Sequence, residues 1–316
     1  MWCGSCERED APGIAAKEAS IATMPPSPEA RAMNLYIHTD IEGVAGMVHF
    51  EKRDDDSQRN WSIRQRMFRL LTDEVNASIE GALEAGVDGT ILVNDAHGSG
   101  YSIIFEDLNS AARIIHGPLT RQPFWTPKLD GSFDALFCVA QHAMAGTNGV
   151  LAHSCWCVNE QYWFGEGGMA MALAGYYDVP GVLITGDDTV CAQCRDLMPT
   201  MEAAVVKEAL SPFNAVSMTP SEAQQTIRDA ARRAIERVGE IEPFTIEGPY
   251  SIGLVGGPGQ IPQNPTEGDD FREVVYEILV RNYHYDLQQQ DPWPIEPGRR
   301  QPFLTKGQLK QLEQEK

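Results

Sequence analysis

The sequence has little positive charge for its length. Its 316 residues include 25 Lys and Arg against 45 Asp and Glu, which gives a formal net charge of −20. Proteins that bind nucleic acids need clustered cations to neutralise phosphates, and binding to an anionic membrane surface has the same requirement, so this balance argues against both partners. It suits instead a protein that binds metal cations through carboxylate and imidazole groups.

Long apolar runs are also missing. The least polar window, residues 167–186, is interrupted by Asp178 and Pro180, so no transmembrane helix is predicted. Residues 7–10 are all charged where a secretory signal needs apolar residues, and we infer no signal peptide. Seven cysteines are an odd number and too few for a disulfide framework in a long chain, which favours a reducing, cytoplasmic location.

Several catalytic and binding motifs are absent. No Gly-x-Ser-x-Gly elbow occurs, which argues against a serine hydrolase. The segment Gly256–Gly259 lacks the Lys-Ser/Thr of a phosphate loop and the spacing of a dinucleotide loop, so nucleotide binding is not expected. Two CxxC pairs, at residues 3–6 and 191–194, could hold a structural zinc ion together, but the first lies on a polar tail and unlinked thiols are favoured.

From Asn34 onwards, short apolar runs alternate with helical periodicity. Residues 35–40 are typical of a strand, and apolar side chains at four-residue steps between Ile63 and Leu83 predict an amphipathic helix that stops near Gly86. Further strands are expected at 90–93, 135–140, 182–185, 203–206 and 250–255, and helices at 167–175 and 227–238, whereas 274–280 fits either type. The alternation predicts an α/β fold with a mostly parallel sheet flanked by helices and a smaller C-terminal α+β segment.

Composition divides the chain into four expected regions. Residues 1–33 are polar and proline-containing and are expected to form a flexible N-terminal extension. Residues 34–200 are expected to form a metal-binding α/β catalytic domain, 201–286 a C-terminal α+β subdomain, and 287–316 a polar tail.

Potential metal ligands follow the predicted strands. Asp40 and Glu42 lie two residues apart after the first strand, so in extended geometry both carboxylates point to one side. His97 and His142 each follow an apolar strand, and His153 lies a little further along. Glu166 lies between glycines at a predicted helix start. Because functional groups in parallel sheets gather beyond the carboxyl ends of strands, these side chains are expected to converge.

Each of these residues also has an ordinary structural explanation. The two acids could mark an exposed strand end, His97 could cap a loop, His142 could be a buried, hydrogen-bonded histidine, and Glu166 could favour a helix N-terminus. Their joint placement at strand ends favours a dinuclear zinc site, since each zinc ion takes about four or five nitrogen and oxygen ligands and one carboxylate can bridge two ions.

An ordered set of short motifs resembles a known family. The motifs are Asp40-Ile41-Glu42-Gly43, Val93-Asn94-Asp95-Ala96-His97, Gln141-His142-Ala143, His153-Ser154, Gly165-Glu166-Gly167, Ala174-Gly175-Tyr176-Tyr177-Asp178-Val179-Pro180 and Gly186-Asp187-Asp188. With this set the chain resembles the DppA-type D-aminopeptidases, which are dizinc metallopeptidases, over about residues 34–221, with a weaker trace to about Val255.

The resemblance implies a role for each residue and two Zn²⁺ per chain. Asp40 would bridge the two ions, Glu42 and His142 would complete one site, and His97 and Glu166 the other. His153 matches the family's catalytic histidine, described as a nucleophile, although a role as general acid/base or oxyanion stabiliser fits as well. The implied enzyme is a metal-dependent aminopeptidase that hydrolyses the N-terminal amide bond of short peptides or amino-acid amides, and a ring-like homo-oligomer is expected.

Some alternatives stay open. The same metals could serve an amidohydrolase for a non-peptide or γ-linked amide, or the chain could be a non-catalytic, metal-binding oligomeric scaffold. Selectivity for D-amino acids is not decided by the sequence. The segment 155–163 is shorter than the family pattern, and its aromatic residues, Trp156, Tyr162 and Trp163, fit either a substrate pocket or a core or interface.

Overall fold

The structure is a computed structural model that describes residues 31–53, 55–98, 100–117 and 125–282. The cysteine pair at residues 3–6, nearly all of the expected extension and the expected polar tail therefore lie outside the described residues. The large sheet, the second sheet and every residue proposed above for the metal site lie within them.

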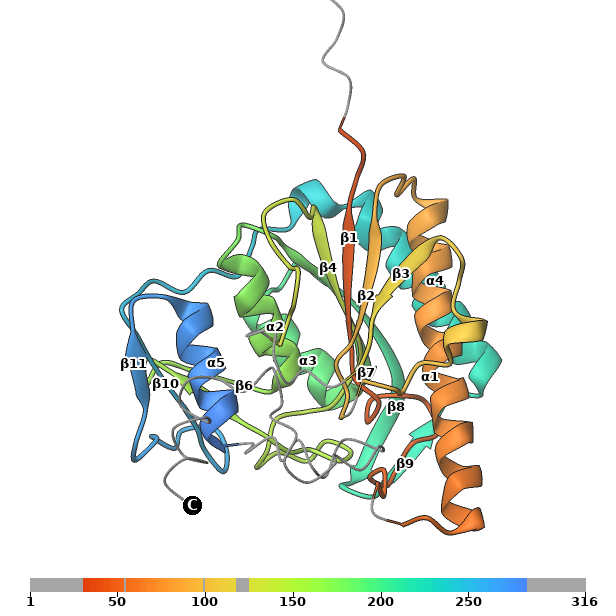
Figure 1. The fold of residues 1–316 in the computed structure, drawn as a ribbon, viewed down its shortest axis with the longest axis horizontal. Coiled ribbons are helices and arrows are strands. Elements are labelled where there is room, and N and C mark those ends of the chain that lie inside the picture. The colour runs from red at the N-terminus through yellow and green to blue at the C-terminus, as the bar shows by residue number, and fades with distance from the viewer. Residues whose placement is uncertain (1–30, 54, 99, 118–124, 283–316) are drawn as a thin grey trace, which may run out of the picture. The chain divides into compact units, whose positions relative to one another are not determined.

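A seven-stranded sheet forms the centre of the described residues (Figure 1). The strands lie in the order β3-β2-β1-β4-β7-β8-β9, and every neighbouring pair is parallel except the last, β8 with β9. Their bounds are β1 Leu35–Thr39, β2 Ile91–Asp95, β3 Ala112–Ile115, β4 Ala135–Gln141, β7 Gly181–Asp187, β8 Glu202–Ser211 and β9 Asn214–Ser217. The predicted α/β fold class is confirmed.

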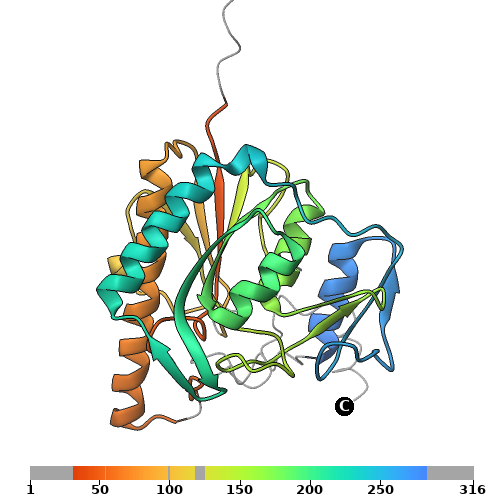
Figure 2. The same ribbon diagram turned by 180° about the vertical axis from the view of Figure 1, so that it is seen from behind.

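Helices cover both faces of this sheet (Figures 1 and 2). The chain leaves β1 towards β2 on one side and β4 towards β7 on the other, and right-handed crossovers then place the connecting helices on opposite faces. Helices α1 (Gln58–Glu84) and α4 (Pro220–Glu236) pack together on one face, and α2 (Glu166–Gly175) and α3 (Asp188–Leu197) lie on the other. Gly81 permits the close helix contact, because a Cβ there would lie 2.1 Å from the Arg228 carbonyl oxygen.

The core follows the periodicity read from the sequence. The central strands β1 and β4 are buried along their whole length, as expected for parallel strands covered on both faces. Helix α1 starts at the N-cap Ser57, whose side chain accepts from the Asn60 amide, and it buries Leu71, Val75 and Ile79. The four-residue apolar spacing therefore marks the face of α1 that packs on the sheet.

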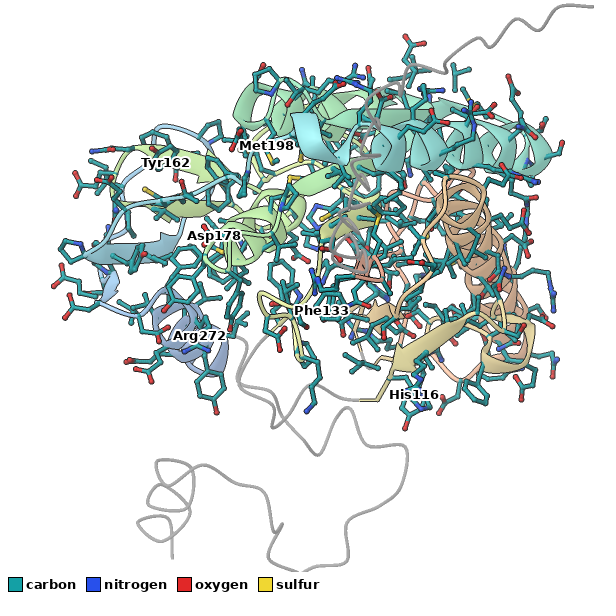
Figure 3. The ribbon with its side chains drawn as sticks, turned by 90° about the horizontal axis from the view of Figure 1, so that it is seen from above. His116, Phe133, Tyr162, Asp178, Met198 and Arg272 are labelled. Carbon is teal, nitrogen blue, oxygen red and sulfur yellow. The ribbon has the colours of Figure 1, made fainter. Side chains whose placement is uncertain are left out.

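A second, antiparallel sheet stands beside the first, with the strand order β11-β10-β5-β6. Its strands are β5 Trp156–Val158, β6 Tyr162–Phe164, β10 Tyr250–Leu254 and β11 Thr266–Gly268, and α5 (Phe271–Asn282) packs on it through Val274, Val275 and Ile278. Viewed from above, Tyr162 and Arg272 lie on this side of the described residues, and His116, just after β3, lies on the opposite side (Figure 3).

The elements are grouped differently from the expected division at residue 200. Strands β8 and β9 join the large sheet and α4 packs on α1, because β8 finds its hydrogen-bonding partner in β7. The hairpin β5–β6 comes from the middle of the chain but pairs with β10. The ambiguous segment 274–280 is helical.

The direction of strand addition reverses between β1 and β4. Beyond their carboxyl ends the loops diverge, and in such sheets this switch point is where ligands bind. Across the described residues, no helix combines the length and apolar character that a membrane span requires.

Candidate metal centre

All six residues proposed from the sequence lie at this switch point. Asp40 and Glu42 follow β1, and His97 follows β2. His142 follows β4, His153 precedes β5, and Glu166 is the first residue of α2. Five of them line a cavity of about 420 Å³, and His142 lies behind them with its Nε2 atom 3.6 Å from both Asp40 Oδ2 and Glu166 Oε1.

Asp40, Glu42 and His97 form the first of two clusters of potential ligands. Each offers one ligand atom within 4.8 Å of the others, and all three side chains are buried. His97 Nε2 lies 3.3 Å from Glu42 Oε1, while its Nδ1 lies 3.0 Å from the Ser102 hydroxyl. The hydroxyl fixes the orientation of the ring, so that Nε2 faces the two carboxylates.

The loop that carries Glu42 is held from several directions. Gly43 has no side chain because a Cβ there would lie 2.3 Å from the Ala140 carbonyl carbon, at the end of β4. Lys207 on β8 is 2% exposed and donates from Nζ to the carbonyl oxygens of Glu42, Val44 and Met47. Glu74 of α1 accepts from the Ala45 amide at 2.8 Å.

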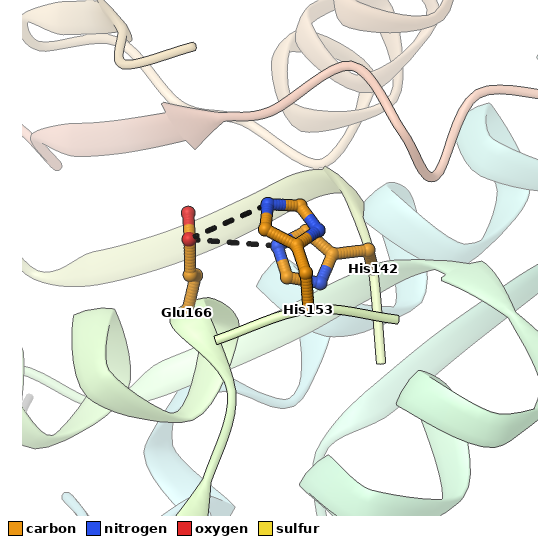
Figure 4. Close-up of side chains that lie close together, drawn as sticks. All are labelled: His142, His153 and Glu166. Carbon is orange, nitrogen blue, oxygen red and sulfur yellow. Dashed lines mark ion pairs between the residues drawn. The ribbon is translucent and has the colours of Figure 1, made fainter. Parts of the chain in front are cut away.

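His142, His153 and Glu166 form the second cluster (Figure 4). Glu166 Oε1 lies 3.6 Å from His142 Nε2 and 3.9 Å from His153 Nε2, and it accepts a hydrogen bond from the Ser154 hydroxyl at 2.7 Å. The two imidazole rings are stacked, with centroids 3.7 Å apart. His142 is fully buried, whereas 40% of the His153 side chain is exposed at the cavity.

Backbone contacts determine which nitrogen of each histidine is available. His142 Nδ1 lies 2.8 Å from the Ala143 carbonyl oxygen, and His153 Nδ1 lies 2.8 Å from that of Leu151. A carbonyl oxygen only accepts, so Nδ1 carries the proton and donates in both rings. In the neutral ring the Nε2 lone pair is then free, which is the form that binds metals.

Three buried atoms of the potential ligands have no hydrogen-bond partner among the described residues: Asp40 Oδ2, Glu42 Oε2 and His142 Nε2. Leaving such atoms unpaired in a protein interior costs free energy, and native structures rarely tolerate it. Oxygen and imidazole nitrogen atoms are the donors that Zn²⁺ takes. The chemistry of the donor set therefore fits divalent metal ions.

The charges in the cluster lead to the same conclusion. Burial, together with the nearby charges of Glu42 and Glu166, raises the pKa of Asp40 well above its ordinary value. Burial alone would also raise the pKa of Glu42 and Glu166, but His97 holds that of Glu42 well below its usual range, and His142 lowers that of Glu166 to about 2. Clustered carboxylates repel one another, and a divalent cation relieves that repulsion.

The clusters pair the side chains differently from the expected ligand sets. Glu42 lies with His97 instead of His142, and Glu166 lies with His142 instead of His97. Strand order is the reason, since β2 and β4 flank β1 on opposite sides. Asp40, which follows the central strand, belongs to the first cluster and also approaches His142 of the second.

Comparisons with known proteins agree with this geometry. The family model described as D-aminopeptidase, peptidase family M55, matches residues 33–255. The chain belongs to this family. The D-aminopeptidase of Bacillus subtilis (strain 168) is 30% identical over 219 residues, which cover 67% of this chain and 77% of that protein.

Among solved structures, the chain is similar to the Zn-dependent D-aminopeptidase DppA from Bacillus subtilis, described as a self-compartmentalizing protease. The TM-score is 0.68 and the identity 26%, and the match covers 79% of this chain and 96% of that one. Membership of the D-aminopeptidase family makes this chain a hydrolytic enzyme, an aminopeptidase. The matched range ends at Val255, where the similarity expected from the motifs also ends, so β11 and α5 lie beyond it.

Sequence reasoning did not identify several residues of the cavity. Phe50, Glu51 and Arg53 line it from the loop before α1, and Trp125 lines it from the segment before β4. Phe50 meets the edge of the His153 ring at 5.3 Å between centroids. The loop has no periodicity or recognisable spacing, so only its proximity in the fold reveals these residues.

The structure resolves the aromatic residues of the shortened segment. Trp156 is 1% exposed and yet lines the cavity, so it belongs to both the core and the pocket. Tyr162 packs edge-on against Phe244, and Trp163 donates from Nε1 to the Gln260 carbonyl oxygen at 2.8 Å. The latter two side chains are structural.

Proposed function

We propose that this aminopeptidase binds two zinc ions at the switch point and hydrolyses the N-terminal amide bond of short peptides or amino-acid amides. The proposal rests on one observation: two clusters of potential ligand side chains meet at one cavity, which all of them except His142 line, and Asp40 lies between the clusters. In this arrangement Asp40, Glu42 and His97 would hold one ion, and Asp40, His142 and Glu166 the other. The zinc dependence named for DppA supports this choice of metal.

Bound zinc supplies Lewis-acid chemistry, because it polarises a carbonyl group and makes water more acidic. The chain's own residues orient the substrate. The net charge of −20 attracts the cationic amino terminus of a peptide towards the chain, which favours presentation of the first amide bond for cleavage. Trp125 and Trp156 give the cavity an apolar wall.

His153 is the proposed catalytic residue. Its Nδ1–H is held by the Leu151 carbonyl, so its Nε2 atom can accept a proton at the cavity and return it to the leaving amine. Its exposure sets it apart from the fully buried His142, although both lie near Glu166. A group that exchanges protons with substrate must reach the cavity, and His153 meets that requirement.

We also propose that the enzyme assembles as a homo-oligomer and prefers D-amino acids. The description of DppA as a self-compartmentalizing D-aminopeptidase supports both. The five described cysteines are free thiols, which fits the reducing, cytoplasmic location expected from the sequence.

Metal analysis and turnover measured on the same preparation test the proposal. We expect about two zinc ions per chain and faster hydrolysis of D-alaninamide than of L-alaninamide. Two zinc ions without turnover of any aminoacyl substrate would favour an amidohydrolase for a different amide. If the protein binds no metal and is inactive, a non-catalytic scaffold is the interpretation that remains.

A further inference from the structure

Arg53 stands out among the residues that line the cavity. It is the only Lys or Arg there, within the described part of the chain, and four of its fellow lining residues are acids: Asp40, Glu42, Glu51 and Glu166. The Arg53 side chain is 48% exposed, so it is neither buried for stability nor directed wholly into solvent. The position of this single cationic side chain among acidic residues suggests a functional role.

The guanidinium group lies close to the first ligand cluster. Gly98 directly follows His97 and adopts φ +55°, and a Cβ at Gly98 would lie 2.7 Å from Arg53 Nη1. Glu51 Oε2 lies 3.7 Å from His97 Nδ1 and 3.8 Å from Arg53 Nε. One carboxylate oxygen therefore separates the guanidinium group from the imidazole of a proposed ligand.

The hydrogen-bonding capacity of Arg53 is largely unused. Glu51 makes its shorter contact with a different arginine, because Arg64 Nε donates to Glu51 Oε1 at 2.7 Å. The 3.8 Å contact with Arg53 is longer than a hydrogen bond. Within the described residues the guanidinium makes no hydrogen bond, and its planar set of five N–H donors suits a carboxylate.

We infer that Arg53 is a specificity-determining residue that binds the free α-carboxylate of a short peptide substrate, so that its guanidinium group contributes to the hydrolysis of such peptides and not to that of amino-acid amides. This inference rests on the proposed aminopeptidase function and specifies its substrate. Zinc bound at the two clusters would offset the charges of Asp40, Glu42 and Glu166, so these acids would not keep a substrate carboxylate away from the Arg53 guanidinium group.

The dimensions agree with a dipeptide. Its carboxylate carbon lies only about 4 Å from the carbon of the cleaved amide, because three bonds separate them. Each additional residue moves the carboxylate away by up to about 3.5 Å. The guanidinium group lies on the same cavity as the proposed metal ligands, with Glu51 between it and His97, and the cavity volume of about 420 Å³ is typical of a small-ligand site.

Two substrates that share an amino end but differ at the other end test the inference. The zinc-loaded wild type and Arg53→Gln are compared on D-alanyl-D-alanine and D-alaninamide. We expect kcat/KM for the dipeptide to fall roughly 10- to 100-fold, mainly through KM, because a charge-assisted hydrogen-bonded pair is lost. We expect the value for the amide to change by less than about twofold, since the amide makes no such pair.

Matched controls separate recognition from folding. Arg113→Gln removes an exposed arginine of β3, outside the cavity, and should leave both substrates unaffected. Arg53→Lys should recover part of the loss, and zinc content and unfolding midpoint should stay at wild-type values in Arg53→Gln. Equal losses on both substrates, or no loss on the dipeptide, would overturn the role of Arg53 alone. A wild type that cleaves neither substrate would refute the proposed function, and this inference with it.

Discussion

Lys207→Met is the substitution whose effect the structure predicts most fully. The ammonium group is buried and donates to three carbonyl oxygens of the loop that carries Glu42: those of Glu42 itself, of Val44 at 3.1 Å and of Met47 at 2.8 Å. Methionine has a similar length but no donor. The substitution therefore leaves the shape of the core largely intact and removes all three hydrogen bonds.

The cost follows from what stays buried. A buried carbonyl left without a donor costs about 1–3 kcal/mol, and removing one partner from a buried charge network costs about 3–5 kcal/mol. The buried ammonium group also costs free energy, because it loses its hydration on folding, and burial accordingly lowers the pKa of Lys207 to about 8. The substitution removes this cost, which offsets part of the loss in stability. We expect the free energy of unfolding to fall by about 3–5 kcal/mol, because three carbonyls lose their donor at once.

The effect should extend to metal binding, because Lys207 holds the backbone of Glu42. We expect the zinc ion at the Asp40–Glu42–His97 cluster to bind more weakly, and the ion at the His142–Glu166 cluster to be retained. Urea unfolding of metal-free protein measures the first effect, and zinc titration the second. Lys128→Met, at an exposed lysine, is the matched control and should change stability by less than about 0.5 kcal/mol.

A loss below about 1 kcal/mol in Lys207→Met would refute the reasoning, since it would mean that water or a relaxed loop replaces the lost donor. Unchanged zinc affinity at both sites, despite lower stability, would show that the hydrogen bonds of Lys207 to the loop do not influence metal binding. Lys207→Arg keeps the charge and several donors and should recover part of the stability.

The remaining predictions concern the catalytic group, the ligands and a buried acid. His153→Ala should keep about two zinc ions and lose roughly 10²- to 10⁴-fold in kcat, and retained turnover would remove His153 from the mechanism. His97→Ala or Glu166→Ala should each lose one zinc ion, measured by metal analysis; full occupancy would exclude that residue as a ligand. Burial raises the pKa of Glu74 to about 7 from the usual 4.5, so the folded state binds its proton more tightly than the unfolded state does. Its contribution to stability is fully present below pH 4.5 and is lost as the pH rises through 7, by about 3 kcal/mol in all, and urea unfolding of Glu74→Gln between pH 4.5 and 8 should lack this component.

The convergence of the six residues could be predicted because it depends on local signals. Apolar, β-branched runs such as 90–93 mark buried parallel strands, and the polar residue that follows each run lies at the same edge of the sheet. The pairing within the site could not be predicted in this way. It depends on strand order, and the spacing of Glu42, His97 and His142 along the chain does not say which strands flank β1.

Other features depend on contacts between segments far apart in the sequence. The second sheet joins β5 and β6 to β10, which comes about 90 residues later in the chain. Composition reports only local features of the chain, so the boundary that it placed at residue 200 does not follow this pairing. Glu51 and Arg53 lie in a loop without periodicity, and their place beside His97 becomes apparent only when β1 and β2 are paired.

In three of the proposed ligands, one polar atom is held by a neighbouring group and the other is directed at the clusters. One nitrogen of His97 is held by Ser102 and one of His142 by the Ala143 carbonyl, while Asp40 Oδ1 accepts from the Ile41 amide at 2.8 Å. Within the described residues, Asp40 Oδ2, Glu42 Oε2 and His142 Nε2 have no hydrogen-bond partner, and burial together with the charges of Glu42 and Glu166 raises the pKa of Asp40. Packing of the strands holds the carboxylates close together in the folded chain in spite of their repulsion. A divalent cation that binds there removes this unfavourable interaction and so stabilises the folded state. Metal should therefore raise the stability of this chain more than that of any variant in which Asp40 is neutral.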